Sequence, residues 1–166
     1  MRCVLQRVLS ASVEVDGETV GAIGPGLLCL VGIAADDTDR DAEWLARKLL
    51  RCRAFGGAEG KPWELDVASA GYEILCVSQF TLHARFKKPR PDFSKAMGPG
   101  GARPFYEAFL ERLRAGYEPG KVKDGRFGAM MKVELINDGP VTFVFDSRAP
   151  DGGSGSTSSL STADDG

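Results

Sequence analysis

Four polar side chains suited to acyl-transfer chemistry follow one another at the end of an apolar segment. Ser78, Gln79, Thr81 and His83 come directly after the run 74–77, whose pattern is typical of a β-strand. Successive strand residues point to opposite faces, so Gln79, Thr81 and His83 share one face and Ser78 lies on the other. A hydroxyl, an amide and an imidazole would then border one pocket. The simpler alternative is that this face reaches solvent.

The residue types also argue against several classes of enzyme. A Ser-His-Asp triad would need His83, the single histidine, but a regular strand turns Ser78 away from it and no G-x-S-x-G motif occurs. A zinc site of the usual kind has too few ligands, because the four cysteines are dispersed. No Gly-rich phosphate loop is present. We therefore expect no metal and no cofactor.

The segment 137–142, Asn-Asp-Gly-Pro-Val-Thr, interrupts a second alternating region. Proline cannot donate to a β-ladder, and Gly139-Pro140 joins the most permissive backbone to the most restricted one. The flanking patterns predict two strands joined by a turn, and an ordinary hairpin with a trans Pro140 would satisfy them. Arg7 is a cation on the apolar face of the first strand and needs acceptors, for which the carbonyls of this turn are candidates.

Periodicity predicts an α+β domain. Strands are expected over residues 2–9, 11–16, 18–23, 27–33, 72–82, 131–136 and 141–146, with a hairpin turn at Asp16-Gly17. Helices are expected over 39–51, after a capping box of Thr38 and Asp41, and over 103–115, with Phe105, Phe109 and Leu113 on one stripe.

Length and composition suit one intracellular domain. The chain has 166 residues and a net charge of -2, and residues 1–150 alone sum to +1. Cysteines without C-x-x-C spacing, and the lack of a signal peptide or membrane span, favour a reduced, cytoplasmic protein. Residues 149–166 are rich in Gly, Ser, Thr and Asp, so we expect a disordered tail after a domain of residues 1–148.

Four short motifs have the order and spacing of a known family. They are Gln6-Arg7-Val8, Ser78-Gln79-Phe80-Thr81-Leu82, Gly125-Arg126-Phe127-Gly128 leading to Met131, and Asn137-Asp138-Gly139-Pro140-Val141-Thr142. Together they resemble the D-aminoacyl-tRNA deacylase family over residues 1–148. The stretches 87–93 and 123–125 and the polar tail are more similar to eukaryotic members than to bacterial ones.

The resemblance implies a homodimer with a small barrel-like β-sheet packed by two helices. In this family the Gly139-Pro140 peptide is cis and enters the active site of the partner subunit. Its carbonyls would hold the amino group of a D-residue and leave no room for an L side chain. Glycine has no side chain, so glycyl-tRNA, formed by mischarging of the alanine tRNA, is an implied second substrate.

The implied reaction is hydrolysis of the ester that joins an amino acid to the terminal adenosine of tRNA. Backbone N–H groups near Phe80 and Thr81 would stabilise the oxyanion, and Ser78 and Gln79 would line the pocket. Thr81 acts either as a nucleophile or as an orienting group beside the adenosine 2′-hydroxyl. The second role is favoured, because no obvious base is in reach to activate the Thr81 hydroxyl.

The remaining implied roles concern binding. Arg7 would brace the Gly-Pro turn, and Phe127, Gly128 and Met131 would receive the adenine. Bacterial members usually have tyrosine at the position of His83, so the resemblance gives this histidine no catalytic role. It could still alter the pH profile, since an imidazole titrates near neutrality.

Residues 85–95 form a strongly basic loop. The loop contains Arg85, Lys87, Lys88, Arg90 and Lys95 against a single acidic residue, Asp92. We expect Lys87, Lys88 and Arg90 to contact the acceptor end of tRNA through its phosphates. Two alternatives remain open: a non-catalytic tRNA-binding module that uses this loop, and a general serine or threonine esterase that acts on small esters without RNA.

Overall fold

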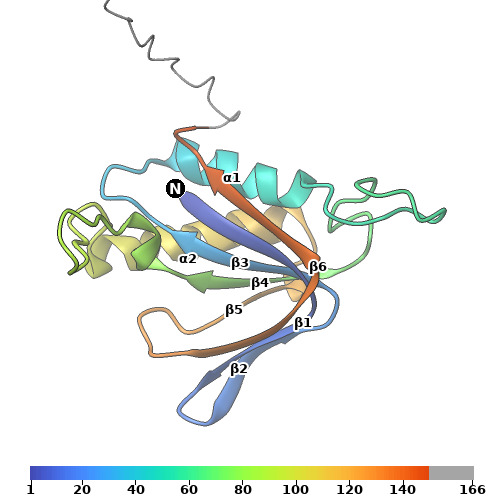
Figure 1. Ribbon diagram of the computed structural model, residues 1–166, viewed down its shortest axis with the longest axis horizontal. Helices are drawn as coiled ribbons and strands as arrows, with labels where there is room; N and C mark the ends of the chain where they lie inside the picture. Colours follow the sequence, from blue (N-terminus) through green and yellow to red (C-terminus); the bar gives the residue numbers. More distant parts are fainter. Residues whose placement is uncertain (150–166) are drawn as a thin grey trace, which may run out of the picture.

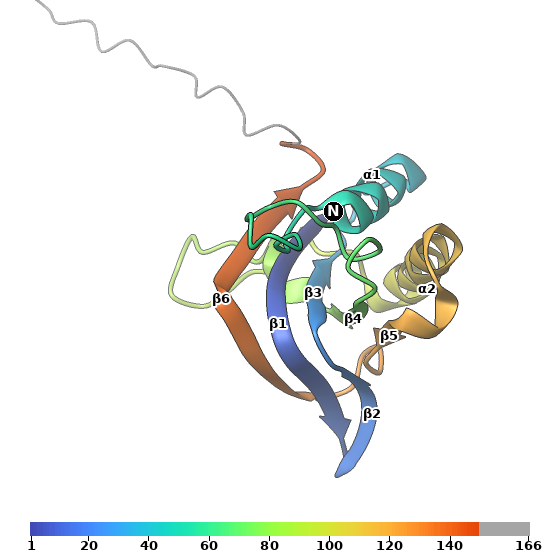
Figure 2. The ribbon, with the colours of Figure 1, turned by 90° about the vertical axis from the view of Figure 1, so that its right-hand side faces the viewer.

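The protein, as a computed structural model, is described over residues 1–149. A six-stranded sheet carries two α-helices on one face (Figures 1 and 2). The strands are β1 (Arg2–Val15), β2 (Glu18–Ile23), β3 (Gly26–Gly32), β4 (Glu73–Ser78), β5 (Val122–Asp124) and β6 (Lys132–Asp146). The predicted tail of residues 149–166 lies outside the described residues, except for Ala149.

The long strand β1 organises the sheet because it pairs along both of its edges. On one edge its first half pairs with β3 and its second half with β2, and along the other edge it pairs with β6, all antiparallel. The strands β3, β4 and β5 follow in parallel. The predicted hairpin turn at Asp16-Gly17 is confirmed, with φ angles of 52° and 84°.

The sheet curls into a nearly closed barrel (Figure 2). Across the opening, β2 approaches β5 so closely that a Cβ on Gly21 would lie 2.4 Å from the carbonyl oxygen of Asp124. The curve encloses buried apolar side chains, namely Val8, Ala11, Val13, Val15, Ile23, Leu28, Leu75 and Val77. The predicted α+β, barrel-like fold with two helices is confirmed.

The two helices cover the outer face of the sheet and enclose the larger core. The helix α1 (Asp39–Arg51) has the predicted bounds and capping box, in which the Thr38 backbone N–H donates to the Asp41 carboxylate at 2.8 Å. The second helix, α2 (Pro99–Gly116), buries Tyr106, Phe109, Leu110 and Leu113. It begins four residues before the predicted start, because Pro99 occupies the first turn and Pro104 lies inside the helix.

Two further expectations about strands are wrong. The segments 2–9 and 11–16 are one strand, β1, and the segment 72–82 is a strand only to Ser78. After Ser78, the Gln79 N–H donates to the Val31 carbonyl at 2.7 Å and the chain turns into a short 3₁₀ helix, η1 (Phe80–His83). A second 3₁₀ helix, η2 (Pro119–Lys121), precedes β5.

The predicted hairpin around Asp138-Gly139 is also wrong. Residues 132–146 form one strand that runs along β1 without reversing. Its register changes abruptly, from Thr142 opposite Gln6 to Asn137 opposite Val8, so residues 138–141 bulge out of the ladder. We call these four residues the Gly-Pro bulge.

Candidate active site

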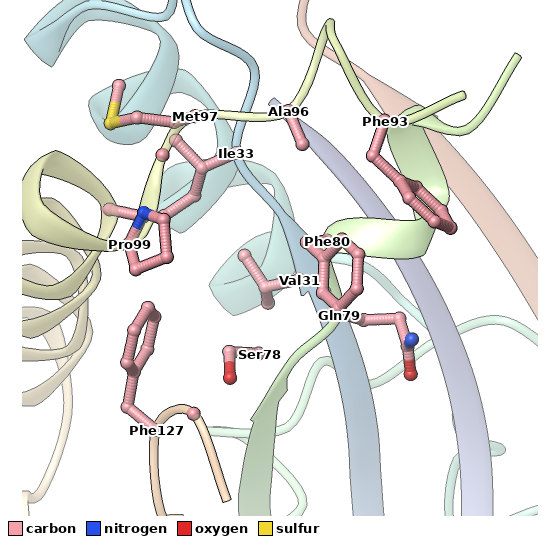
Figure 3. A pocket seen from close by; sticks show the side chains of 13 residues that line it. Val31, Ile33, Ser78, Gln79, Phe80, Phe93, Ala96, Met97, Pro99 and Phe127 are labelled. Carbon is pink, nitrogen blue, oxygen red and sulfur yellow. The ribbon is translucent and has the colours of Figure 1, made fainter. Parts of the chain in front are cut away.

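A hollow of about 420 Å³ opens at the end of β4, between η1 and the start of α2 (Figure 3). We call it the aromatic pocket. Its lining residues come from five segments: Val31 and Ile33; Ser78, Gln79 and Phe80; Phe93, Ala96 and Met97; Gly98, Pro99 and Ala102; and Phe127 and Gly128. The lining is mostly apolar, and the polar side chains among these residues are Ser78 and Gln79.

One wall of the aromatic pocket is built by the end of β4 and by η1. The exposed ring of Phe80 packs edge-on against Phe93, with centroids 4.9 Å apart. Ser78 lies deep between Val31 and Phe127, while the Gln79 side chain extends to the other side (Figure 3). The predicted candidates Ser78, Gln79 and Phe80 therefore meet at one hollow.

The opposite wall is formed by Phe127 and Gly128, two of the three residues that the resemblance assigns to binding of the adenine. The Phe127 ring lies 5.6 Å from the ring of Tyr106, and the guanidinium of Arg103 lies 5.0 Å above it. Arg103 also donates to the Phe127 carbonyl at 3.3 Å. Met131 lies elsewhere, against the core inside the barrel, so it does not line this pocket.

Thr81 stands at the rim of the pocket, and its side chain does not line it. Its hydroxyl accepts a hydrogen bond from the side-chain amide of Gln79. This contact keeps together two of the three residues that alternation placed on one face. The third, His83, is turned away because η1 replaces the predicted strand.

His83 is buried on the far side of η1. It is 8 % exposed and packs against Gly32, and burial lowers its pKa from the ordinary value, partly offset by a backbone hydrogen bond with Gly32. Its Nε2 atom has no partner in the described part of the chain. The imidazole is thus neutral at pH 7 and does not approach the hydroxyl of Thr81.

The Gly-Pro bulge is fixed to its own chain by side chains. The peptide bond between Gly139 and Pro140 is cis, as the resemblance implies. The side-chain amide of Asn137, just before the bulge, donates to two carbonyls. One is that of Arg7 in β1, at 2.8 Å, and the other is that of Val141 at the end of the bulge, at 3.1 Å. Gly139 and Pro140 are exposed and do not line the aromatic pocket of the same chain.

Arg7 lies beneath the bulge but with partners other than those expected. Its Nε lies 2.8 Å from the carboxylate of Asp138, and it donates to the Ala54 carbonyl at 2.7 Å. A Cβ on Gly139 would lie 3.2 Å from the Arg7 guanidinium. Sequence reasoning found Arg7 and missed Asp138 and Ala54 as its partners.

The basic loop, residues 85–95, projects beside the pocket. Arg85 and Asp92 exchange backbone hydrogen bonds of 2.8 and 2.9 Å at its base, and Phe93 connects it to the pocket wall. Lys87, Lys88 and Arg90 are exposed between these points. The described residues contain no group of three metal-binding side chains.

Known proteins share both this sequence and this fold. The profile of the D-Tyr-tRNA(Tyr) deacylase family matches residues 4–146. The chain belongs to this family. A D-aminoacyl-tRNA deacylase of Dictyostelium discoideum is 50 % identical over 149 residues, which cover 89 % of this chain and 99 % of that protein.

Solved structures agree with this family membership. One, named c-Myc DNA Unwinding Element Binding Protein, has a TM-score of 0.85 and 49 % identity, covering 88 % of this chain and 98 % of that one. Another, a probable eukaryotic D-amino acid tRNA deacylase, shares the fold at 18 % identity, with a TM-score of 0.73 and coverage of 87 % and 97 %. The resemblance based on four motifs is confirmed, as is the prediction of a deacylase-type enzyme. No helix within residues 1–149 is long and apolar enough to cross a membrane.

Proposed function

We propose that this member of the deacylase family hydrolyses the ester bond of D-aminoacyl-tRNA. The observation that carries the proposal is a pairing of features: a mostly apolar, aromatic pocket that contains Ser78, and a glycine-proline bulge outside it. A hollow of about 420 Å³ lies in the range of small-molecule sites and suits an adenosine. Domain 1–148 would be the catalytic unit, in the cytoplasm.

The pocket residues are suited to hold the terminal adenosine. The rings of Phe80 and Phe127 are available for stacking with a nucleobase, which is a common way for proteins to bind unpaired bases. Arg103 and Tyr106 hold Phe127 in place. Gly128 has a φ of 76° and lets the backbone turn closely around this wall.

The ester carbonyl would lie near the start of η1. The first N–H groups of a helix have no partner within it, which leaves those of Phe80 and Thr81 available for an oxyanion. The first 3₁₀ hydrogen bond runs from the Leu82 N–H to the Gln79 carbonyl at 3.2 Å, consistent with this reading. Oriented donors of this kind stabilise the charge that develops in the transition state.

Thr81 would orient the substrate and not attack it. The partner of its hydroxyl is the amide of Gln79, which cannot accept a proton, and His83 is buried on the other side of η1. A nucleophilic threonine needs a base to remove its proton. The adenosine 2′-hydroxyl, already adjacent to the ester, would assist the attacking water.

Chirality would be selected across a homodimer. The Gly-Pro bulge is exposed on its own chain, so its carbonyls can enter the aromatic pocket of a second copy. They would hold the amino group of a D-residue and exclude an L side chain, whereas glycyl-tRNA would be accepted. Exposed apolar side chains on β1 and β6, namely Leu9, Ile136 and Val144, offer surface for such an interface.

The decisive test is deacylation of matched D- and L-aminoacyl-tRNA by the purified protein without added metal. We expect rapid hydrolysis of the D-form, slow hydrolysis of the L-form, and a dimer by light scattering. Equal rates on both enantiomers, or none on either, would reject the proposal. RNA binding without turnover would support a tRNA-binding module that uses Lys87, Lys88 and Arg90. Hydrolysis of small esters without RNA would support a general esterase.

A further inference from the structure

A second hollow, of about 190 Å³, lies on the other side of η1 from the aromatic pocket. We call it the basic cleft. Its lining residues are Arg2, Ala34, Asp36, His83, Ala84, Arg85, Lys95, Asp146 and Arg148. Four of these are cationic at neutral pH and two are acidic, so the cleft has an excess of positive charge.

The acidic residues of the cleft are already neutralised by arginines. Arg2 pairs with Asp146 at 2.8 Å, and Arg148 pairs with Asp36 at 2.6 Å. The hydrogen bond from Arg148 lowers the pKa of Asp36, so this carboxylate is ionised and fully paired at pH 7. These pairs cancel one another and leave the net charge to the other two cations.

Arg85 and Lys95 are those two cations. Neither forms an ion pair with a carboxylate of residues 1–149, and both side chains are exposed at the cleft. They occupy the two ends of the basic loop. An anion in the cleft would therefore meet two cations that no ion pair within residues 1–149 neutralises.

His83 contributes a largely buried imidazole to the lining of the cleft. Its imidazole is 8 % exposed, and Nε2 has no hydrogen-bond partner in the described part of the chain. Nε2 is itself shielded from solvent, so a ligand in the cleft does not reach it. The ring N–H is used by the backbone of Gly32, so the imidazole adds no positive charge and leaves Arg85 and Lys95 as the groups that can contact an anion.

The cleft and the aromatic pocket are neighbours. Ile33 and Ala96 line the pocket, while the adjacent Ala34 and Lys95 line the cleft, and a backbone bridge joins residues 34 and 96. The 3₁₀ helix η1 likewise contributes Phe80 to the pocket and His83 to the cleft. A polymer whose last unit enters the pocket thus has its preceding units close to the cleft.

We propose that the basic cleft binds a backbone phosphate of the unpaired 3′ strand whose terminal adenosine occupies the aromatic pocket. Arg85 and Lys95 would contact the phosphate oxygens through charge-assisted hydrogen bonds. This subsite rests on the proposed function, since that function places the adenosine in the pocket. The contact would strengthen binding of tRNA but not of an aminoacyl-adenosine, which has no preceding backbone phosphate.

The test compares two substrates and matched variants. Wild type, Arg85→Gln, Lys95→Gln and the double variant act on a D-aminoacyl-tRNA and on the corresponding 3′-D-aminoacyl-adenosine. Arg47→Gln removes an exposed cation of α1 far from both hollows and is the control. We expect the double variant to raise the KM for the tRNA about tenfold with kcat little changed, and to leave the adenosine substrate unaffected. Lys95→Arg should retain the wild-type KM.

Salt dependence and direct binding complete the test. One lost phosphate contact on a single strand lowers the slope of log K against log salt by about 0.7. The binding probe is a fluorescent single-stranded RNA that ends in CCA, so the cleft is tested even if no deacylation occurs. Equal losses on both substrates, or equal losses in Arg47→Gln, would overturn the proposal. So would wild-type binding of the RNA by the double variant. Failure of wild type to hydrolyse either substrate would reject the proposed function, and the RNA-binding measurement would then decide on the phosphate subsite.

Discussion

The aromatic pocket and the Gly-Pro bulge are built in opposite ways. The pocket forms where regular elements end, and each wall packs against the core: Phe127 on Tyr106, Ser78 after the buried strand β4. The bulge forms where a strand is interrupted, and polar side chains hold it. Asn137 donates to the carbonyls of Arg7 in β1 and Val141 in the bulge, and Arg7 pairs with Asp138.

This difference indicates how the two parts would work together. In the proposed reaction the apolar hollow would provide binding energy for the adenosine. The bulge exposes backbone groups in a fixed orientation but has no pocket of its own within one chain. Selectivity can therefore reside in the bulge and affinity in the pocket, provided that two copies meet as proposed.

The largest expected effect comes from Gly139→Ala. Gly139 has a φ of 117°, and an added Cβ would lie 2.7 Å from the Val141 side chain and 2.9 Å from its backbone nitrogen. Strain of this kind costs on the order of 1–3 kcal/mol, so the bulge must shift. We expect kcat/KM for D-aminoacyl-tRNA to fall about 100-fold, with a smaller ratio of D to L rates. Gly120→Ala, where a Cβ meets nothing within 4 Å, is the control. Unchanged chiral selectivity would separate the bulge from recognition.

The next effect, on affinity, comes from Phe127→Ala. Loss of one base-stacking ring costs about 1–3 kcal/mol, so we expect the KM to rise about 5- to 150-fold while the ratio of D to L rates is kept. Met130→Ala, which removes a side chain that is 92 % exposed three residues away, should change neither quantity. Steady-state kinetics on both enantiomers distinguish the two roles. A loss of chiral selectivity in Phe127→Ala would remove the contrast between pocket and bulge.

Thr81→Ala should have a smaller effect. The hydroxyl accepts one hydrogen bond, from Gln79, and a single hydrogen bond contributes about 0.5–1.5 kcal/mol. We expect kcat to fall by about fivefold, and Thr81→Ser to retain most of the activity. Abolition of turnover in Thr81→Ala, combined with a trapped acyl-enzyme in wild type, would instead identify Thr81 as the nucleophile.

Local sequence signals predicted the elements that local interactions determine. The capping box at Thr38 and the Asp16-Gly17 turn set the start of α1 and the β1-β2 hairpin without help from distant residues. The same Asp-Gly dipeptide occurs at 138–139, but there it predicted a turn that the chain does not make. Period two continues on both flanks, and only pairing with the long strand β1 decides that the chain continues and does not reverse.

The site residues also divide into those that local motifs predicted and those that long-range packing determines. Ser78, Phe80 and Phe127 could be found from motifs, whereas Met131 was misplaced, because it faces the barrel interior with Val133 and Leu135. The lining residues Met97 and Pro99 were missed, since Gly98-Pro99-Gly100-Gly101 resembles a loop and becomes helical through the packing of Ala102. Glycines in a first helical turn are stabilised by tertiary contacts that a sequence pattern does not reveal.

The smallest expected effect is a pH dependence of stability that comes from His83, which lies outside both the aromatic pocket and the Gly-Pro bulge. Burial lowers the pKa of His83 below its unfolded value, so folding favours the neutral imidazole. Its contribution to stability is complete above an unfolded pKa of about 6.5 and is lost as the pH falls through the folded pKa. The charged groups around it are Arg2, Asp36, Asp37, Arg85, Lys95, Asp146, Arg148 and the amino terminus.

Urea unfolding of wild type and His83→Gln at pH 8, 7, 6 and 5 measures the contribution of His83 to the free energy of unfolding. We expect the stability difference between the two proteins to be constant above pH 7 and to shift in favour of the variant below pH 6, because glutamine has no proton to gain. The ratio of D to L rates should not change with pH in either protein, since His83 lies on the far side of η1 and does not contact the bulge. Parallel stability curves would show that His83 titrates alike in the folded and unfolded chain. If the ratio of D to L rates changed with pH in wild type but not in His83→Gln, His83 would influence the Gly-Pro bulge, which it does not contact in the structure.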